Sequence, residues 1–240
     1  MRLRIALLPF LSAILLGPAP GEAAASPPTS PGVVLDPGHG GRDMGAVAKG
    51  KREKSLVLEI ARRIKEKLDQ SGVPVRMTRD SDEYVPLDRR IAESMWKNAL
   101  LLVSLHLNKI RSPRPEGITV YAYGNPEGLS LSVTRRNLSP LPPPPRSQAR
   151  ASAEAAAEIV RALLASDFRV EPPSRAPYYI LRNPRIPSVL IELGYLSNPK
   201  DAAMLSDPAY QDRLASALAR GLRFSLAKKV RKGPPTLASR

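Results

Sequence analysis

The chain has only two histidines, and each follows a short apolar run. His39 lies in a Gly- and Pro-rich segment after one such run, His106 directly follows residues 100–105, and Glu192 follows residues 189–191 in the same way. Short apolar runs rich in β-branched residues are typical of buried strands. Because open α/β sheets bind ligands beyond the carboxyl ends of their strands, we expect these three polar side chains to converge on one site.

Histidine and glutamate side chains are also common metal ligands. A catalytic zinc ion often has two imidazole ligands, one carboxylate ligand and one open position. His39 and His106 can supply the imidazoles, and Glu53, near the start of a predicted helix, is the candidate carboxylate. Spacing alone leaves a second interpretation of Glu53 open, because the helix dipole also stabilises a glutamate in a first turn. The chain has no cysteine, so thiolate ligands and disulfides are excluded.

Glu192 requires an explanation because its neighbours are apolar. Leu190, Ile191 and Leu193 should be buried, and a carboxylate among buried residues needs a partner or a function. A general base next to a metal-activated water would meet this requirement. Glu192 is therefore a candidate for such a base.

The segment around His39 has two other interpretations. Residues 38–41 read Gly-His-Gly-Gly, which is as rich in glycine as a phosphate-binding loop. The segment lacks the Gly-Lys-Ser/Thr ending of a P-loop and the full spacing of a dinucleotide-binding loop, so nucleotide binding is disfavoured. A single histidine in a glycine-rich turn can also be an ordinary loop residue.

Apolar periodicity predicts alternating strands and helices around these residues. From Leu56 to Leu68 apolar residues recur every fourth position, which is typical of an amphipathic helix. The predicted strands cover residues 33–35, 73–77, 100–105, 118–123, 178–181 and 189–191, and the predicted helices cover residues 55–68, 87–97, 150–166 and 208–228. We expect the strand at 118–123 to lie nearer an edge, and residues 124–150, rich in Pro, Ser and Arg, to form an exposed loop. This order indicates an α/β fold, a single domain with a central, mostly parallel sheet flanked by helices on both faces.

The charge of the chain indicates what it can bind. The formal net charge is +15, which favours attraction to polyanions. For an exported protein these are cell-wall polymers and membrane surfaces. Nucleic acid is disfavoured as a partner, because aromatic residues are few and no basic stripe interleaves with them.

Five motifs, in unbroken order between about residues 33 and 222, resemble the zinc-dependent N-acetylmuramoyl-L-alanine amidases of the family called amidase 3. They are the segments 34–41, 52–54, 78–80, 104–108 and 187–198. Agreement among several separate motifs is far more specific than any one glycine-rich loop.

The resemblance implies a set of roles and a reaction. His39, Glu53 and His106 match the family's ligands for one zinc ion, and Glu192 matches its catalytic glutamate. The implied reaction is hydrolysis of the amide between N-acetylmuramic acid and the L-alanine of the peptide stem in peptidoglycan. We expect a monomer without a self-blocking helix, and leave open whether an activator protein is needed.

The two ends of the chain differ in composition from the middle. Arg2 and Arg4 precede an apolar stretch and a small-residue cleavage site, so residues 1–25 are predicted to be a signal peptide for export to a periplasm or outer wall. A membrane anchor is the alternative, although the stretch is short for a bilayer span. With the signal removed, we expect no stable membrane insertion. Residues 26–31 are predicted to be a linker, 32–227 the catalytic domain and 228–240 a basic, disordered tail.

Two rival functions remain open at this point. The same ligand set could serve a zinc peptidase that cuts within the peptide stem. A protein that binds the wall without turnover could also keep the fold. Because both histidines and both glutamates are present, the second rival is the less favoured one.

Overall fold

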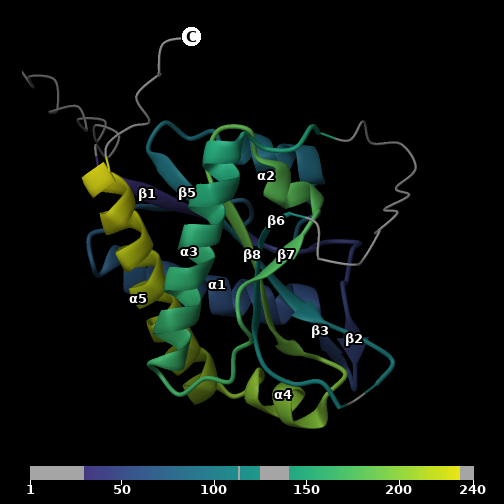
Figure 1. Ribbon diagram of the computed structural model, residues 1–240. Helices are drawn as coiled ribbons and strands as arrows, with labels where there is room; N and C mark the ends of the chain where they lie inside the picture. Colours follow the sequence, from purple (N-terminus) through teal and green to yellow (C-terminus); the bar gives the residue numbers. More distant parts are fainter. Residues whose placement is uncertain (1–29, 113, 125–140, 233–240) are drawn as a thin grey trace, which may run out of the picture.

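The computed structural model describes residues 30–112, 114–124 and 141–232, which form one six-stranded sheet with helices on both faces (Figure 1). The strand order is β4-β1-β5-β8-β6-β7, and every neighbouring pair is parallel except β6 with β8. The strands are β1 (Gly32–Pro37), β4 (Val75–Met77), β5 (Ala99–Asn108), β6 (Thr119–Tyr123), β7 (Ser174–Ala176) and β8 (Ser188–Tyr195). A small antiparallel hairpin, β2 (Val47–Ala48) and β3 (Lys51–Arg52), stands apart from the sheet.

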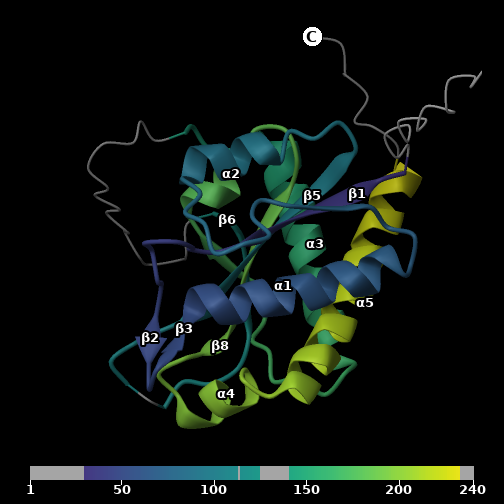
Figure 2. The same ribbon diagram turned by 180° about the vertical axis from the view of Figure 1, so that it is seen from behind.

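Three long helices cover one face of the sheet, and short helical elements cover the other (Figures 1 and 2). The long helices are α1 (Glu53–Asp69), α3 (Arg146–Leu164) and α5 (Pro208–Lys232). The opposite face carries α2 (Leu87–Glu93) and the 3-10 helix η1 (Tyr179–Arg182), while α4 (Pro199–Met204) precedes α5. The predicted fold class is therefore confirmed.

The core explains why the central strands are almost continuously apolar. Val33 and Leu35 of β1 pack with the long helices, whereas Val34 between them packs with α2 and η1. A parallel sheet buried on both faces needs apolar residues at every strand position, not at alternate ones. Polar residues within these strands are therefore costly unless they have partners or a function.

The predicted strand at residues 178–181 is wrong. The segment forms η1, and the edge strand β7 lies just before it, at Ser174–Ala176. Ile180 and Leu181 are consecutive and both buried against α2, which a helical turn allows. A short apolar run cannot by itself distinguish a strand from a buried turn of helix.

Several predicted boundaries also differ. Helix α2 ends at Glu93, four residues before the predicted end at residue 97, and α3 begins at Arg146, inside the predicted loop 124–150. Residues 125–140 of that loop, the signal peptide at 1–25 and most of the linker lie outside the described residues. Helix α5 continues to Lys232, so the expected disorder is wrong for residues 228–232. Within the described ranges, no helix combines the length and apolar character needed to cross a bilayer.

Candidate metal centre

The sheet order brings the predicted site residues together. Strands β1, β5 and β8 are direct neighbours, and His106 of β5 pairs in register with Glu192 of β8. His39 follows the last residue of β1 by two positions, and Glu53 is the first residue of α1. The structure brings these residues together toward the carboxyl end of the sheet, although His106 and Glu192 lie within their strands and not after them.

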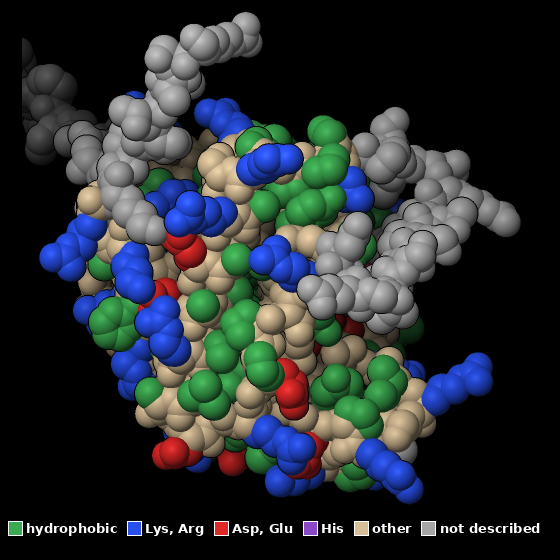
Figure 3. Space-filling view, viewed as in Figure 1, with side chains coloured by type: hydrophobic (Ala, Val, Ile, Leu, Met, Phe, Trp, Pro, Cys, Tyr) green, Lys and Arg blue, Asp and Glu red, His purple; other side chains and the backbone are tan. Residues whose placement is uncertain are grey.

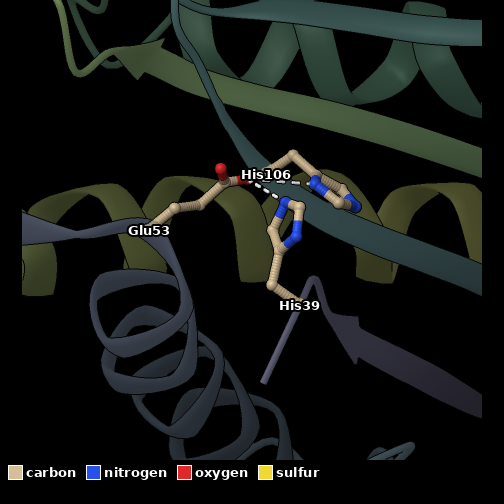
Figure 4. Close-up of side chains that lie close together, drawn as sticks. All are labelled: His39, Glu53 and His106. Carbon is tan, nitrogen blue, oxygen red and sulfur yellow. Dashed lines mark hydrogen bonds and ion pairs between the residues drawn. The ribbon is translucent and has the colours of Figure 1, made fainter. Parts of the chain in front are cut away.

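His39, Glu53 and His106 form a compact cluster (Figure 4). Glu53 Oε1 lies 3.0 Å from His39 Nε2 and 3.0 Å from His106 Nδ1. The two imidazole rings meet edge to face, with centroids 5.0 Å apart. One ligand atom from each residue lies within 4.8 Å of the other two, so the three donors can face a common ion.

Glu53 is held in its ionised form. Its Oε1 accepts a hydrogen bond from the Leu107 amide at 2.9 Å, and its Oε2 accepts one from the Ala46 amide at 2.7 Å. Burial alone would raise the pKa of this carboxyl, but the hydrogen bonds and charges of His106 and His39 outweigh burial and hold the pKa well below 4.5. The side chain is therefore a buried anion that needs a cation among its neighbours.

His39 lies beside a second carboxylate that sequence reasoning missed. Its Nδ1 is at ion-pair distance, 2.9 Å, from Asp43 Oδ2, while Nε2 faces Glu53. Burial lowers the pKa of His39, but Glu53 and Asp43 outweigh it and raise the pKa above 6.5. A carboxylate on the far nitrogen of an imidazole is the arrangement that fixes the orientation of metal-binding histidines. The only signal for it in the sequence is an acidic residue four positions after His39.

Glycines make room for the cluster. A Cβ at Gly38 would lie 2.3 Å from Cε1 of His106, and a Cβ at Gly45 would lie 2.5 Å from Oε2 of Glu53. Both contacts are far too short, so only glycine allows the loop to approach the ligands this closely. His39 itself has a φ of 58°, a left-handed backbone that residues with a side chain rarely adopt. Two imidazoles and a carboxylate in such a cradle fit a divalent transition metal.

Two buried arginines hold the loop that carries His39 through hydrogen bonds to backbone carbonyls. Arg79 donates to the carbonyls of Pro37, Gly38 and Lys54 at 2.8–2.9 Å. Arg90 donates to the Pro37 carbonyl at 2.7 Å and to the His39 carbonyl at 2.6 Å. The loop's carbonyls are thus paired although they are buried, as buried backbone groups must be.

Arg90 also pairs with Asp36, a carboxylate buried in β1. Asp36 Oδ1 accepts from Arg90 Nη1 at 2.7 Å and from Thr78 at 2.6 Å, and Oδ2 accepts from Ser104 at 2.7 Å. Burial would raise the pKa of Asp36, but Arg90 and the two hydroxyls outweigh burial and lower the pKa below 3.8. A second buried polar cluster, formed by Asp36 and its three partners, therefore lies next to the loop that carries His39.

Glu192 differs from the other buried carboxylates. Its Oε2 is buried and has no hydrogen-bond partner among the described residues. Burial raises the pKa of Glu192, His106 and His39 lower it, Glu53 raises it further, and the result is about 7. A carboxyl group with that pKa can accept and release a proton near neutral pH. The structure places it beside His106, across the β5–β8 pair.

Comparison with known families gives an independent view of the chain. The family model described as N-acetylmuramoyl-L-alanine amidase matches residues 33–223. That range includes every strand of the sheet except the first residue of β1, and all of the candidate site residues.

Curated relatives carry the same description. The N-acetylmuramoyl-L-alanine amidase AmiC of Escherichia coli O6:H1 is 30% identical over 235 residues, covering 88% of this chain and 56% of the relative. AmiC of Neisseria meningitidis serogroup B is 31% identical over 225 residues, covering 84% of this chain and 54% of the relative. The chain thus spans about half the length of these two relatives.

Solved structures share the fold. The amidase AmiC2 of Nostoc punctiforme has a TM-score of 0.64 and 31% sequence identity, covering 82% of this chain and 97% of that chain. The CwlD amidase of Clostridioides difficile, solved in complex with the GerS lipoprotein, has a TM-score of 0.66 and 28% identity, covering 83% of this chain and 100% of that chain.

Proposed function

Since the chain belongs to the N-acetylmuramoyl-L-alanine amidase family, we propose that it hydrolyses the amide bond between N-acetylmuramic acid and the L-alanine of the peptide stem in peptidoglycan. One observation carries the proposal most directly. Glu192, whose buried Oε2 has no hydrogen-bond partner among the described residues, stands next to a cluster of two imidazoles and a carboxylate. This combination is the one that metal-assisted amide hydrolysis requires.

We propose that His39 Nε2, His106 Nδ1 and the carboxylate of Glu53 hold one zinc ion. Imidazole donors favour zinc over magnesium or calcium, which prefer oxygen ligands. Zinc held there would supply a Lewis acid, which polarises a carbonyl and makes a water molecule more acidic. Asp43 would keep the His39 ring oriented, and the two buried arginines would keep the loop in place.

Glu192 is the proposed general base and acid. Its free Oε2 takes a proton from the water that attacks the scissile carbonyl, and returns the proton to the amine that leaves. Its place on a central strand fixes the carboxyl group relative to His106. A base on a rigid strand needs no rearrangement before it accepts the proton.

We further propose that the protein works outside the cytoplasm. The basis is the predicted signal peptide at residues 1–25 and the description of relatives from staphylococci as probable cell wall amidases. The CwlD structure includes a lipoprotein partner, so an activator is a reasonable target for a pull-down with this chain.

The proposal is tested by the Glu192→Gln variant together with metal analysis. Glu171→Gln is the matched control, because Glu171 is an exposed glutamate away from the cluster. The unmodified chain and the control should contain about one zinc and release intact stem peptides from purified peptidoglycan. Glu192→Gln should keep its zinc and lose activity by a factor of about 10²–10⁴.

Mass spectrometry of the products separates the rival functions. Fragments cut inside the stem would identify a peptidase, and a wall left intact by the zinc-loaded chain would favour a binding protein or a required activator. Full activity of Glu192→Gln would rule out the assigned role of Glu192.

A further inference from the structure

The last turns of α5 carry a surface that the proposed hydrolysis does not use. Residues 220–232 contain no aspartate or glutamate, and their basic side chains include several that point to solvent. Two large apolar side chains share this face, with Phe224 61% exposed and Val230 54% exposed. Figure 3 shows Lys and Arg side chains gathered over the α5 side of the molecule. We define the α5 patch as Arg220, Arg223, Phe224, Lys228, Val230 and Arg231.

Helical geometry makes the α5 patch one continuous face. At 100° per residue, the positions 220, 223, 224, 228, 230 and 231 fall within about 160° of the helix circumference. Each of the six is exposed. Leu222 and Leu226, on the opposite side of the helix, are buried in the core. The patch is therefore an amphipathic surface of cations with apolar side chains among them.

The α5 patch lies at the end of the molecule opposite the metal centre. Lys229 Nζ donates to the carbonyl of Leu100 at 2.9 Å, near the first residue of β5. Gly32, where the chain enters the sheet, pairs with Ala99 at the same end. His106, in contrast, lies near the carboxyl end of β5. Figures 1 and 2 both show the end of α5 beside the start of β1.

A cavity of about 500 Å³ lies under this end of the helix, between α3 and α5. Leu101 and Leu226 line it together with charged side chains of both signs, which include Arg150, Glu158 and Lys228. Lys228 forms an ion pair with Glu158. The cavity is therefore not an apolar site for a lipid chain, and contact with lipid falls to the exposed face of α5.

We propose that the α5 patch binds the surface of a bilayer that contains anionic phospholipid, with Phe224 and Val230 among the headgroups and the arginines on the phosphates. Cationic helix faces with exposed aromatic side chains bind anionic bilayers in this way. The metal centre, at the other end of the strands, then faces away from the membrane. The protein would be held with its site directed at the wall.

The test measures sedimentation of the chain from residue 26 onward with vesicles at about 0.1 M salt, where charges are screened beyond about 10 Å. This chain keeps every described element of the fold. Vesicles of phosphatidylglycerol and phosphatidylcholine are compared with vesicles of phosphatidylcholine alone. Binding should occur only to the anionic vesicles and should weaken as salt is raised.

A pair of variants tests the α5 patch directly. The double variant Arg223→Gln with Arg231→Gln should bind the anionic vesicles about thirtyfold more weakly, since each basic residue near such a surface contributes about 1 kcal/mol. The matched control, Arg89→Gln with Lys200→Gln, removes the same charge from exposed positions on α2 and α4 and should bind normally. Equal losses in both variants would overturn the proposal, because they would show a response to net charge alone. Release of stem peptides from soluble peptidoglycan fragments should be unchanged in both variants.

Insertion of the side chain at position 224 among lipid headgroups is the readout that distinguishes binding to a bilayer from binding to an anionic polymer. A Phe224→Trp variant should show fluorescence that shifts to the blue on anionic vesicles and is quenched by brominated lipid, beyond the signal of Trp96 in the unmodified chain. Soluble polyphosphate should compete poorly at equal phosphate. Absence of quenching, together with full competition by polyphosphate, would instead assign the α5 patch to wall polymers and refute membrane binding.

Discussion

Glu53 and Asp36 show how buried carboxylates serve two purposes in one small region. Glu53 is buried with two imidazoles, each of which can bind a metal, whereas Asp36 is buried with an arginine and two hydroxyls that donate hydrogen bonds to it. Both carboxyls have a lowered pKa, so both are anions at neutral pH. Glu192, with a raised pKa and no partner for Oε2 in the described part of the chain, is the exception among them. The hydrogen-bond and ion-pair partners, more than burial, therefore distinguish Glu53 and Asp36 from the proposed base, Glu192.

Asp36→Asn should reduce stability in a pH-dependent way. The folded-state pKa of Asp36 is lowered, so its ionised form contributes stability above about pH 4, and that contribution is lost as the pH falls toward the folded-state pKa. Removing one charge of the buried pair with Arg90 should cost about 3–5 kcal/mol at pH 7. Urea unfolding at several pH values measures both effects.

The same pH series also gives the result that would contradict this prediction. The loss caused by Asp36→Asn should shrink as the pH is lowered from 6 to 3. A loss of equal size at every pH would mean that the charge of Asp36 does not stabilise the fold. Asp80→Asn, at an exposed position, is the control for general effects of removing a carboxylate.

Gly38→Ala should disrupt the metal centre with little effect elsewhere. The added methyl group would lie 2.3 Å from the His106 ring, so the ring must shift from its place beside Glu53 or the loop must move. We expect zinc affinity to fall by about 10–100-fold, the range typical when ligand orientation is disturbed. Competition with a chelating dye measures the change.

Gly50→Ala is the control for this prediction. A Cβ there meets nothing within 4 Å, although its φ of 76° makes the change strained. It should lower the melting temperature slightly and leave zinc affinity unchanged. Equal zinc affinities for the Gly38 and Gly50 variants would show that contact with His106 does not matter.

At the scale of elements, the loop after β1 depends on the segment after β4. Arg79 follows β4 by two residues and reaches three carbonyls on other segments, while Lys54 and Asp82 bind the same loop at Gly41. The loop therefore has its own hydrogen-bond partners in place of a regular secondary structure. Its conformation is set by neighbours that are distant in the sequence.

Arg79→Lys should weaken both stability and metal binding. A lysine ammonium cannot span the carbonyls of Pro37, Gly38 and Lys54 as the planar guanidinium does, so buried acceptors are left unpaired. Each unpaired group costs about 1–3 kcal/mol, which predicts a total loss of several kcal/mol. Arg76→Lys is the matched control, because Arg76 is half exposed and its one ion pair among the described residues is with Glu93. Similar thermal unfolding of the two variants would contradict the prediction.

Most elements could be predicted from the sequence because both faces of the sheet are buried. Long apolar runs indicate buried strands, and apolar residues at every fourth position of α1 indicate an amphipathic helix. The segment 178–181 could not be assigned correctly, since four residues are too few for a period to show. Helix α4 was not predicted, and its six residues begin with a cap by the Asn198 side chain on the Lys200 and Asp201 amides.

The clustering of the candidate site residues could also be predicted in part. His39, His106 and Glu192 each follow an apolar run, so neighbouring strands bring them together. Glu53 was a candidate from its place near the start of a predicted helix, and the resemblance to a family favoured it over a helix-dipole role. Spacing alone could not decide, because its position depends on how the β2–β3 hairpin turns the chain. Asp43 and the arginine contacts depend on loop conformation, for which local sequence carries little information.

At the scale of the whole molecule, the fold should not depend on the metal. The cluster lies at one end of the sheet, and the large apolar core does not include it. A chelator should therefore lower the melting temperature without unfolding the chain, since a ligand bound only by the native state adds about 4 kcal/mol at 1,000 times its dissociation constant. Circular dichroism during thermal unfolding, with and without chelator, gives the result. Loss of helical signal at room temperature on chelation would show that the metal is structural.

The position of β8 between β5 and β6 also affects how the chain folds. Strands β5 and β6 are close in sequence, yet β8, made much later, separates them in the sheet. The sheet cannot be completed until residue 195 is available, and pairings between distant segments form slowly. A newly made chain would therefore stay unfolded for most of its synthesis. That delay would suit the export proposed from the predicted signal peptide at residues 1–25, because a chain must cross a membrane channel before it folds.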